Sequence, residues 1–109
     1  MQSGQAIDAL SALAQEHRLK LFRLLVQAGA DGMAAGDLAR SIGIPNSSLS
    51  FHLGHLHRSG LIEQRRAGRS LIYSADYRAM DRLVAYLMEN CCGGVGCAPV
   101  TVTQQKEIA

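Results

Sequence analysis

The sequence lacks a long hydrophobic run and any internal repeat. No apolar stretch approaches the roughly 18 residues of a membrane-spanning helix, so we expect no membrane partner. Residues 1–5 contain neither the basic region nor the apolar stretch of a secretory signal, which predicts a cytoplasmic protein. The 109 residues fit a single domain, and that size disfavours most independent enzymes.

Charged residues are also sparse, and they are unevenly distributed. They make up 18% of the chain against 48% hydrophobic residues, which is an ordinary globular composition. Residues 40–69 nevertheless carry five arginines against one acid, Glu63, a net charge of +4, whereas the rest of the chain sums to −2. A positive block in a nearly neutral domain is typical of a polyanion-binding surface, although a solvated basic face has the same composition.

Cysteine is scarce, and its three copies, Cys91, Cys92 and Cys97, fall within seven residues. An odd count in a cytoplasmic chain argues against a framework of structural disulfides. A tight group of thiols instead favours soft-ion binding or redox chemistry.

Hydrophobic periodicity and glycine positions predict a mainly α protein with one small β-hairpin. In the first helix an apolar stripe is formed by Ile7, Leu10, Leu13 and Ala14. The fourth helix is expected to have Asn46 or Ser47 as its N-cap. Helices are expected at 6–14, 16–27, 34–42, from the cap to about 59, and at 76–90, with strands at 61–67 and 70–74.

The order of helix, glycine turn, helix and hairpin describes a winged helix-turn-helix. Ala39 lies where the two helices would cross closely, Gly43 supplies the left-handed turn, and Leu49 anchors the second helix. We assign residues 1–92 to a DNA-binding and dimerisation domain. Residues 93–109 form a C-terminal segment that holds the third cysteine and a polar tail.

The second helix of this unit would enter a major groove of double-stranded operator DNA. Its serines could contact phosphate or cap the helix, and its exposed aromatic ring could touch a thymine methyl or pack against the wing. Arginines at the hairpin tip suit phosphate contacts, or form a solvated turn. His52 borders the apolar arc and is expected to be partly buried. The predicted DNA contacts are Ser47, Ser48, Ser50, Phe51, Arg58, Arg65, Arg66 and Arg69.

Three motifs resemble those of the ArsR/SmtB family of bacterial regulators, over about residues 7–90. They are Ala-Leu-Ala at 12–14 with Arg-Leu-Lys-Leu-Phe-Arg-Leu-Leu at 18–25, Asp-Leu-Ala at 37–39, and Ser-Phe-His-Leu-Gly-His-Leu at 50–56 closed by Ser-Gly-Leu-Ile at 59–62. The resemblance implies a homodimeric repressor that leaves its operator when a metal or metalloid binds. It also implies a dimer interface formed by helices at about 6–14 and 76–90.

The sequence departs from that family at its two common metal sites. Ala34 and Gly36 stand where the classical arsenic site has cysteines. The last helix, 76–90, has no histidine for the zinc site, and Arg78 stands at the position of the first. The cysteine cluster after this helix instead resembles the arsenite-responsive members whose cysteines lie at the C-terminus.

Trivalent arsenic and antimony are soft and take three thiolates, which matches a metal site of Cys91, Cys92 and Cys97. Gly93 and Gly94 would let the chain leave the helix so that the thiols converge. We therefore expect a metalloid-responsive repressor with As(III), and secondarily Sb(III), as inducer. A disulfide switch, another soft ion such as cadmium or lead, and unrelated surface thiols stay open. A thiol enzyme is disfavoured, because the nearest preceding arginine, Arg82, lies more than two turns back.

Overall fold

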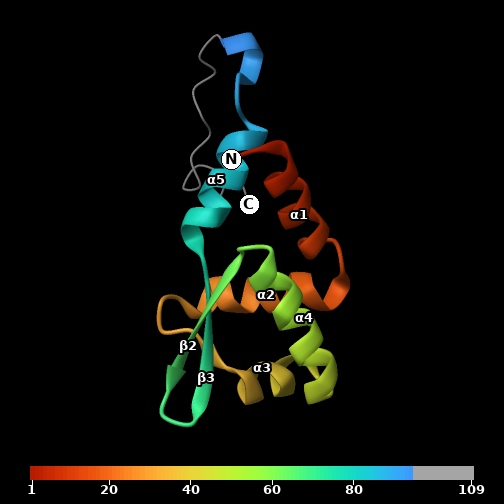
Figure 1. Ribbon diagram of the computed structural model, residues 1–109, viewed down its shortest axis with the longest axis vertical. Coiled ribbons are helices and arrows are strands. Elements are labelled where there is room, and N and C mark those ends of the chain that lie inside the picture. Colours follow the sequence, from red (N-terminus) through yellow and green to blue (C-terminus); the bar gives the residue numbers. More distant parts are fainter. Residues whose placement is uncertain (95–109) are drawn as a thin grey trace, which may run out of the picture.

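The computed structural model describes residues 1–94, which form a winged helix-turn-helix (Figure 1). The predicted helices and the hairpin are all present, and the fold class is confirmed. Cys97 lies outside the described residues, and the division at residue 92 stays a prediction. The elements are α1 (Ser3–Leu13), α2 (Glu16–Ala28), β1 (Met33–Ala34), α3 (Ala35–Ile42), α4 (Asn46–Arg58), β2 (Ile62–Ala67), β3 (Ser70–Ala75), α5 (Tyr77–Leu87) and a short 3-10 helix, η1 (Cys91–Gly94).

The sheet contains a strand that periodicity did not predict. β1 pairs with β3 in an antiparallel three-stranded sheet of order β1-β3-β2. Two residues are too short to show an alternating pattern. The glycine before β1, Gly32, has φ +70°, and a Cβ there would lie 2.2 Å from the carbonyl oxygen of Tyr73. Glycine therefore allows this close approach between the α2–β1 turn and β3.

The core lies where α2, α3 and α4 meet the sheet. Leu49, Leu53 and Leu56 of α4 are at most 2% exposed, which confirms the predicted apolar arc. Ala39 is buried, and Gly43 is left-handed at φ 71° and ψ 39°, as the helix-turn-helix spacing predicts. The remaining fully buried large side chains are Leu21, Leu25, Leu38 and Leu61.

The predicted N-cap of α4 is wrong, whereas the predicted apolar stripe of α1 exists but lies partly outside the core of the single chain. In α1 the buried residues are Ala6, Ala9 and Ala12, and Ile7 and Leu10 of the stripe are exposed. Alanine has the small side chain that close helix packing needs, so the larger residues remain on the outer face. In α4 the N-cap is Pro45, and no side chain caps the helix, because the helix already begins at Asn46.

The end of α5 also differs from the prediction, since the helix stops at Leu87 rather than continuing to residue 90. Asn90 and Cys92 both have φ +57°. A short polar side chain such as asparagine tolerates this left-handed conformation better than most residues do. The chain therefore leaves the α-helix before the cysteines, and not at Gly93.

The elements separate into two ends along the long axis of Figure 1. The hairpin tip, α3 and the first turn of α4 lie at the lower end, whereas α1, α5 and η1 lie at the upper end. Within residues 1–94, none of the helices is both long and apolar enough to cross a membrane.

Candidate nucleic-acid interface and cysteine segment

The exposed arc of α4 follows directly from its buried leucines. Ser47, Ser50, Phe51 and Arg58 are exposed and Ser48 is half-buried. Because Pro45 occupies the N-cap and no side chain caps the helix, capping does not account for the serines. The first turn of α4 thus presents short hydroxyl side chains together with free backbone N–H groups, a combination that suits phosphate.

Phe51 is the most conspicuous residue of this arc. Its side chain is 63% exposed, so most of the ring is not packed against the hairpin or another helix. Its ring meets that of His52 edge-on, with 5.5 Å between ring centroids. An exposed aromatic ring on the outer face of a groove-binding helix is suited to apolar contact with a base.

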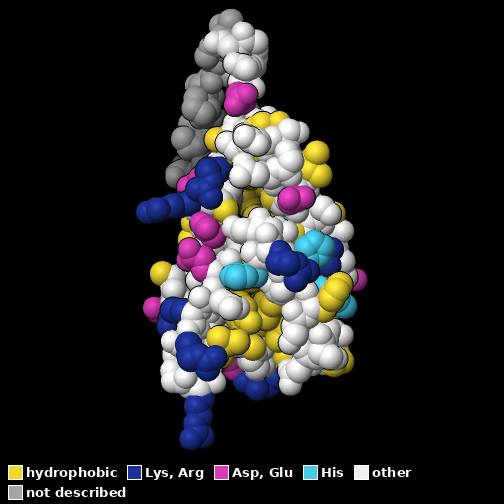
Figure 2. Space-filling model, in the orientation of Figure 1, with side chains coloured by type: hydrophobic (Ala, Val, Ile, Leu, Met, Phe, Trp, Pro, Cys, Tyr) yellow, Lys and Arg dark blue, Asp and Glu magenta, His cyan; other side chains and the backbone are white. Residues whose placement is uncertain are grey.

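The three wing arginines fall into two groups. Arg65 donates a hydrogen bond of 2.9 Å from Nη2 to the backbone carbonyl of Asp31, which ties β2 to the α2–β1 turn. The ion pairs found within residues 1–94 join Lys20 to Glu16 and Arg40 to Asp37, so neither involves the wing. Figure 2 shows basic side chains along the hairpin and projecting beyond its tip.

The tip itself is formed by Gly68 and Arg69 between β2 and β3. Gly68 has φ +63°, which the tight connection requires. Arg66 and Arg69 are exposed. Of the predicted wing contacts, these two are the ones directed to solvent without the anchoring bond that Arg65 makes.

A buried polar pair behind α4 was missed by sequence reasoning. Arg18 of α2 and His52 of α4 are each 9% exposed, and Arg18 Nη1 lies 3.3 Å from His52 Nδ1. The predicted burial of His52 is confirmed. The sequence does contain an indication that Arg18 is buried, because its spacing with Leu21, Phe22 and Leu25 places it on the buried face of α2.

This environment shifts the pKa values of two histidines of α4, His52 and His55. Burial, followed by the charges of Arg18, His17 and His55, lowers the pKa of His52. Burial, followed by the charges of Arg18 and Arg58, lowers the pKa of His55. Both shifts disfavour the imidazolium form.

The described cysteines lie together beyond α5. Their Sγ atoms are 3.6 Å apart, Cys91 is a free exposed thiol, and Cys92 is in disulfide form. The thiolate is the form of cysteine that binds metals, so binding of a soft ion by both sulfur atoms first requires reduction of Cys92. In the part of the chain that the structure describes, no three His, Cys, Asp or Glu residues are grouped for a metal. A three-thiol site therefore depends on Cys97, outside these residues.

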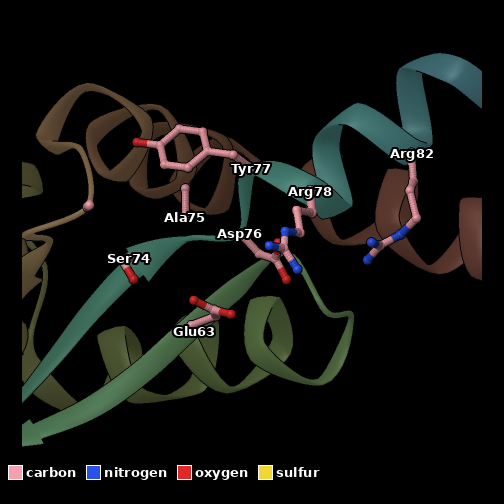
Figure 3. A pocket seen from close by; sticks show the side chains of 8 residues that line it. Glu63, Ser74, Ala75, Asp76, Tyr77, Arg78 and Arg82 are labelled. Atoms are coloured by element: carbon pink, nitrogen blue, oxygen red, sulfur yellow. The ribbon is translucent and has the colours of Figure 1, made fainter.

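The face of the sheet next to α5 carries a different pocket, of about 620 Å³ (Figure 3). Arg78 and Arg82 reach toward it from α5, and Glu63 approaches from β2. Asp76 caps α5 by accepting a hydrogen bond from the backbone N–H of Ala79. The guanidinium group offers hydrogen-bond donors only, so Arg78 cannot replace a zinc-binding histidine.

Comparisons with known proteins agree with this architecture. A helix-turn-helix domain family matches residues 13–65. The chain is 32% identical to the HTH-type transcriptional regulator YgaV of Escherichia coli K12, over 81% of this chain and 87% of that protein. It belongs to the ArsR/SmtB family of winged-helix regulators. The protein is accordingly a DNA-binding transcriptional regulator and not an enzyme, which confirms both expectations at that level.

Two solved structures that are similar to this chain add detail about the relatives themselves. Reduced HlyU from Vibrio cholerae is 26% identical, with TM-score 0.64, over 83% of this chain and 92% of that chain. A homodimeric winged helix-turn-helix DNA-binding domain from Mycobacterium bovis, a possible ArsR-family regulator, is 29% identical with TM-score 0.65. The match covers 78% of this chain and 76% of that domain. The individual DNA-contacting residues and thiol ligands stay predictions.

Proposed function

We propose that the protein is a homodimeric repressor that leaves its operator when As(III), or secondarily Sb(III), binds Cys91, Cys92 and Cys97. The observation that carries the proposal is the pair of sulfur atoms 3.6 Å apart, on an exposed segment four residues after the end of α5. The pair sits at the end of the molecule opposite the wing (Figure 1), so binding there leaves the DNA-reading face unobstructed.

The binding chemistry needs no oxidant once the thiols are reduced. Arsenous acid exchanges three hydroxyl groups for three thiolates: three As–S bonds form and three As–O bonds break. Each thiol proton leaves with a hydroxide as water. Zinc would require a fourth ligand, and within residues 1–94 no grouping of three metal-binding side chains is present to supply one.

Dimerisation is supported by apolar side chains that the single chain leaves exposed. Ile7 and Leu10 lie on α1, and Val84, Leu87 and Met88 lie on or directly after α5. Covering them against a second copy would place two α4 helices about one DNA turn apart. We expect a dimer at micromolar concentration in sedimentation experiments without ligand, and a monomer would contradict the proposal.

The test uses operator DNA, defined here as the duplex that the native protein enriches from a random-sequence library. Reduced protein bound to this duplex is titrated with arsenite, antimonite, cadmium, lead and zinc. We expect release by arsenite. Failure to enrich any duplex would contradict DNA reading, whereas release by cadmium, lead or zinc but not by arsenite would contradict the metalloid assignment.

The cysteines are tested singly by Cys91→Ser, Cys92→Ser and Cys97→Ser. Cys91 is exposed, so its serine variant should fold and bind operator DNA like the native protein. Each variant should lose release by arsenite, because a serine hydroxyl stays protonated at neutral pH and is a poor soft-ion ligand. If all three variants still respond, the ligand binds elsewhere and the sensing proposal is wrong.

A disulfide switch is the second candidate. It is favoured by the disulfide form of Cys92. One solved relative, HlyU from Vibrio cholerae, is described as the reduced protein, so a redox state is distinguished in that relative. Diamide in the absence of metalloid separates the two. Release by diamide, with no response of the reduced protein to arsenite, would replace the first proposal with the second.

A further inference from the structure

Arg18 joins three helices at one buried point. Its Nε donates a hydrogen bond of 2.6 Å to the carbonyl of Ala12 in the last turn of α1. Its backbone N–H donates to Gln15 Oε1 at the start of α2, at 2.9 Å. Its Nη1 lies 3.3 Å from Nδ1 of His52, in the middle of α4. One planar side chain therefore connects the α1–α2 corner to the helix that carries the predicted DNA contacts.

The chemistry of this contact fixes the state of the histidine. Guanidinium nitrogens only donate hydrogen bonds, so Nδ1 of His52 must accept and the ring proton must sit on Nε2. The two ion pairs found in residues 1–94 do not include Arg18, so no carboxylate neutralises it. Among the described residues, every buried side-chain nitrogen or oxygen has a partner. A charged imidazole would remove the acceptor and place two cations in contact.

The location of His52 links this pair to the reading surface. His52 directly precedes the buried Leu53 and follows the exposed Phe51. Its ring lies 5.5 Å from the rings of both Phe51 and His17. A hydrogen bond from outside α4 to this position limits rotation of the helix about its own axis, and such rotation would displace Phe51 and the serines of the first turn.

We propose that Arg18 is a positioning residue for DNA reading, which holds α4 in register through an uncharged His52. The inference rests on the DNA-binding function and is independent of which inducer the cysteines bind. It predicts that sequence-specific binding fails when His52 becomes protonated.

The charged groups around His52 all act in the same direction. Arg18 and His17 approach from α2, and His55 lies one turn along α4 with Arg58 beyond it. Burial and these neighbours lower the pKa of His52, so the neutral form that accepts the bond persists to lower pH than in an ordinary histidine. At lower pH, His52 becomes protonated and at the same time loses its hydrogen bond with Arg18.

The matched variant is His52→Asn. Its amide oxygen can accept from Arg18 at about the position of Nδ1, and it does not titrate. We measure affinity for the operator duplex and for an unrelated duplex, at one salt concentration, near pH 8 and near pH 5.5. Phosphate contacts dominate binding to the unrelated duplex. The ratio of the two affinities therefore measures the part of operator binding that depends on how α4 is oriented toward the bases.

The native protein should lose this ratio progressively as the pH falls, by less than about tenfold near pH 5.5, since one protonation difference is worth at most tenfold per pH unit and the pKa of His52 lies below its ordinary value of 6.5. His52→Asn should hold its ratio nearly constant. An equal loss in native protein and variant would show that another group carries the effect and would overturn the proposal.

Arg18→Lys tests the other partner. Lysine keeps the charge but cannot reach both Ala12 and His52 with separate nitrogens. We expect about a tenfold lower operator affinity near pH 8, with binding of the unrelated duplex within about twofold of native, on the scale of one charge-assisted hydrogen bond. Native affinity of Arg18→Lys for the operator would show that Arg18 acts only through its charge, and equal weakening on both duplexes would show that it does not position α4 for base contacts; either result would overturn the proposal.

A spectroscopic measurement keeps the proposal falsifiable even if Arg18→Lys folds poorly. The ring nitrogen shifts of His52 in native protein near pH 8 should report the tautomer with the proton on Nε2. The opposite tautomer, or an imidazolium, is incompatible with the Arg18 hydrogen bond and would overturn the assignment.

Discussion

The DNA-reading end and the cysteine end of this molecule are built in opposite ways. At the first, α4 is held by leucines that are at most 2% exposed and by a buried arginine–histidine contact. At the second, residues 91–94 are all exposed and two non-glycine residues, Asn90 and Cys92, adopt left-handed backbone angles. Packing therefore fixes the α4 surface, whereas residues 91–94 of the cysteine segment lie outside the core.

This difference suits a switch. A ligand shifts an equilibrium only as far as it binds one conformation better than the other. A segment without core contacts can adopt a ligand-bound geometry at little cost, while a firmly packed α4 moves as a unit. The link between the two ends then lies in α5 and in its contacts with α1 and α2.

The largest expected effect comes from breaking the packed end. Leu56→Ala removes a side chain that is 0% exposed at the centre of the core, and should lower the free energy of unfolding by about 2–5 kcal/mol. Leu19→Ala on α2 is the matched control, because the same residue type is 46% exposed there and lies outside the proposed dimer interface. Chemical denaturation should show little change for it. Equal losses in both variants would contradict the packing of the reading end.

The wing gives the next effect and tests the division among its arginines. Replacing Arg66 and Arg69 together by alanine removes up to four phosphate contacts per dimer. The slope of log K against log salt should then become shallower by up to about 3.6. Arg65→Ala should leave this slope nearly unchanged, since Arg65 is bonded to the Asp31 carbonyl. A larger slope change for Arg65→Ala than for the pair would reverse the assignment.

A smaller effect concerns stability against pH at the packed end. Near pH 8 His52 is neutral in both the folded and the unfolded chain, and its contribution to stability is complete. Below its ordinary pKa of 6.5, the unfolded chain takes up the proton first, because the pKa is lowered in the folded state. The free energy of unfolding should then fall by less than about 1.4 kcal/mol per pH unit until the folded pKa is reached.

His52→Asn measures this contribution, because it leaves the shift of His55, which has the same sign, in place. Urea denaturation across this pH range should give a shallower decline for the variant than for the native protein. Parallel declines would mean that His52 does not carry the effect.

The sequence predicted the packed end well, and physical reasons explain where it failed. The leucines of α4, Ala39 and Gly43 show helical spacing and turn chemistry, which are local signals. Arg18 was missed because an arginine is usually exposed, although its spacing is that of a core position. The anchoring of Arg65 was also missed, because its acceptor is a backbone carbonyl 34 residues away and no local pattern encodes it.

Apolar pattern alone also cannot tell which partner a face will contact. The stripe that includes Ile7 and Leu10 is real, yet within the single chain Ala6 and Ala9 are the residues that pack. Similarly, the helical period through 76–90 did not reveal that α5 stops at Leu87. The backbone reversal there depends on Asn90 and Cys92 rather than on the glycines that follow.

The connection between the two ends includes a single hydrogen bond at the start of α5. The hydroxyl of Tyr77 donates to the carbonyl of Val26, in the last turn of α2, at 2.8 Å. α2 in turn packs against α3 and α4, and Arg18 at its first turn contacts His52. A shift of α5 on ligand binding would therefore reach α2 through Tyr77.

Tyr77→Phe removes this bond and keeps the ring, and it should produce the smallest effect on stability. Tyr77 is 42% exposed, so the loss in free energy of unfolding should be near 0.5 kcal/mol, the low end for a hydrogen bond. The change should be larger in the response: arsenite should bind with native affinity, but should release less operator DNA at saturation, because α5 moves with weaker coupling to α2. Tyr86→Phe on the same helix is the control. Arsenite binding and DNA release are measured on the same samples, and a variant that releases DNA fully at saturation would remove this bond from the coupling.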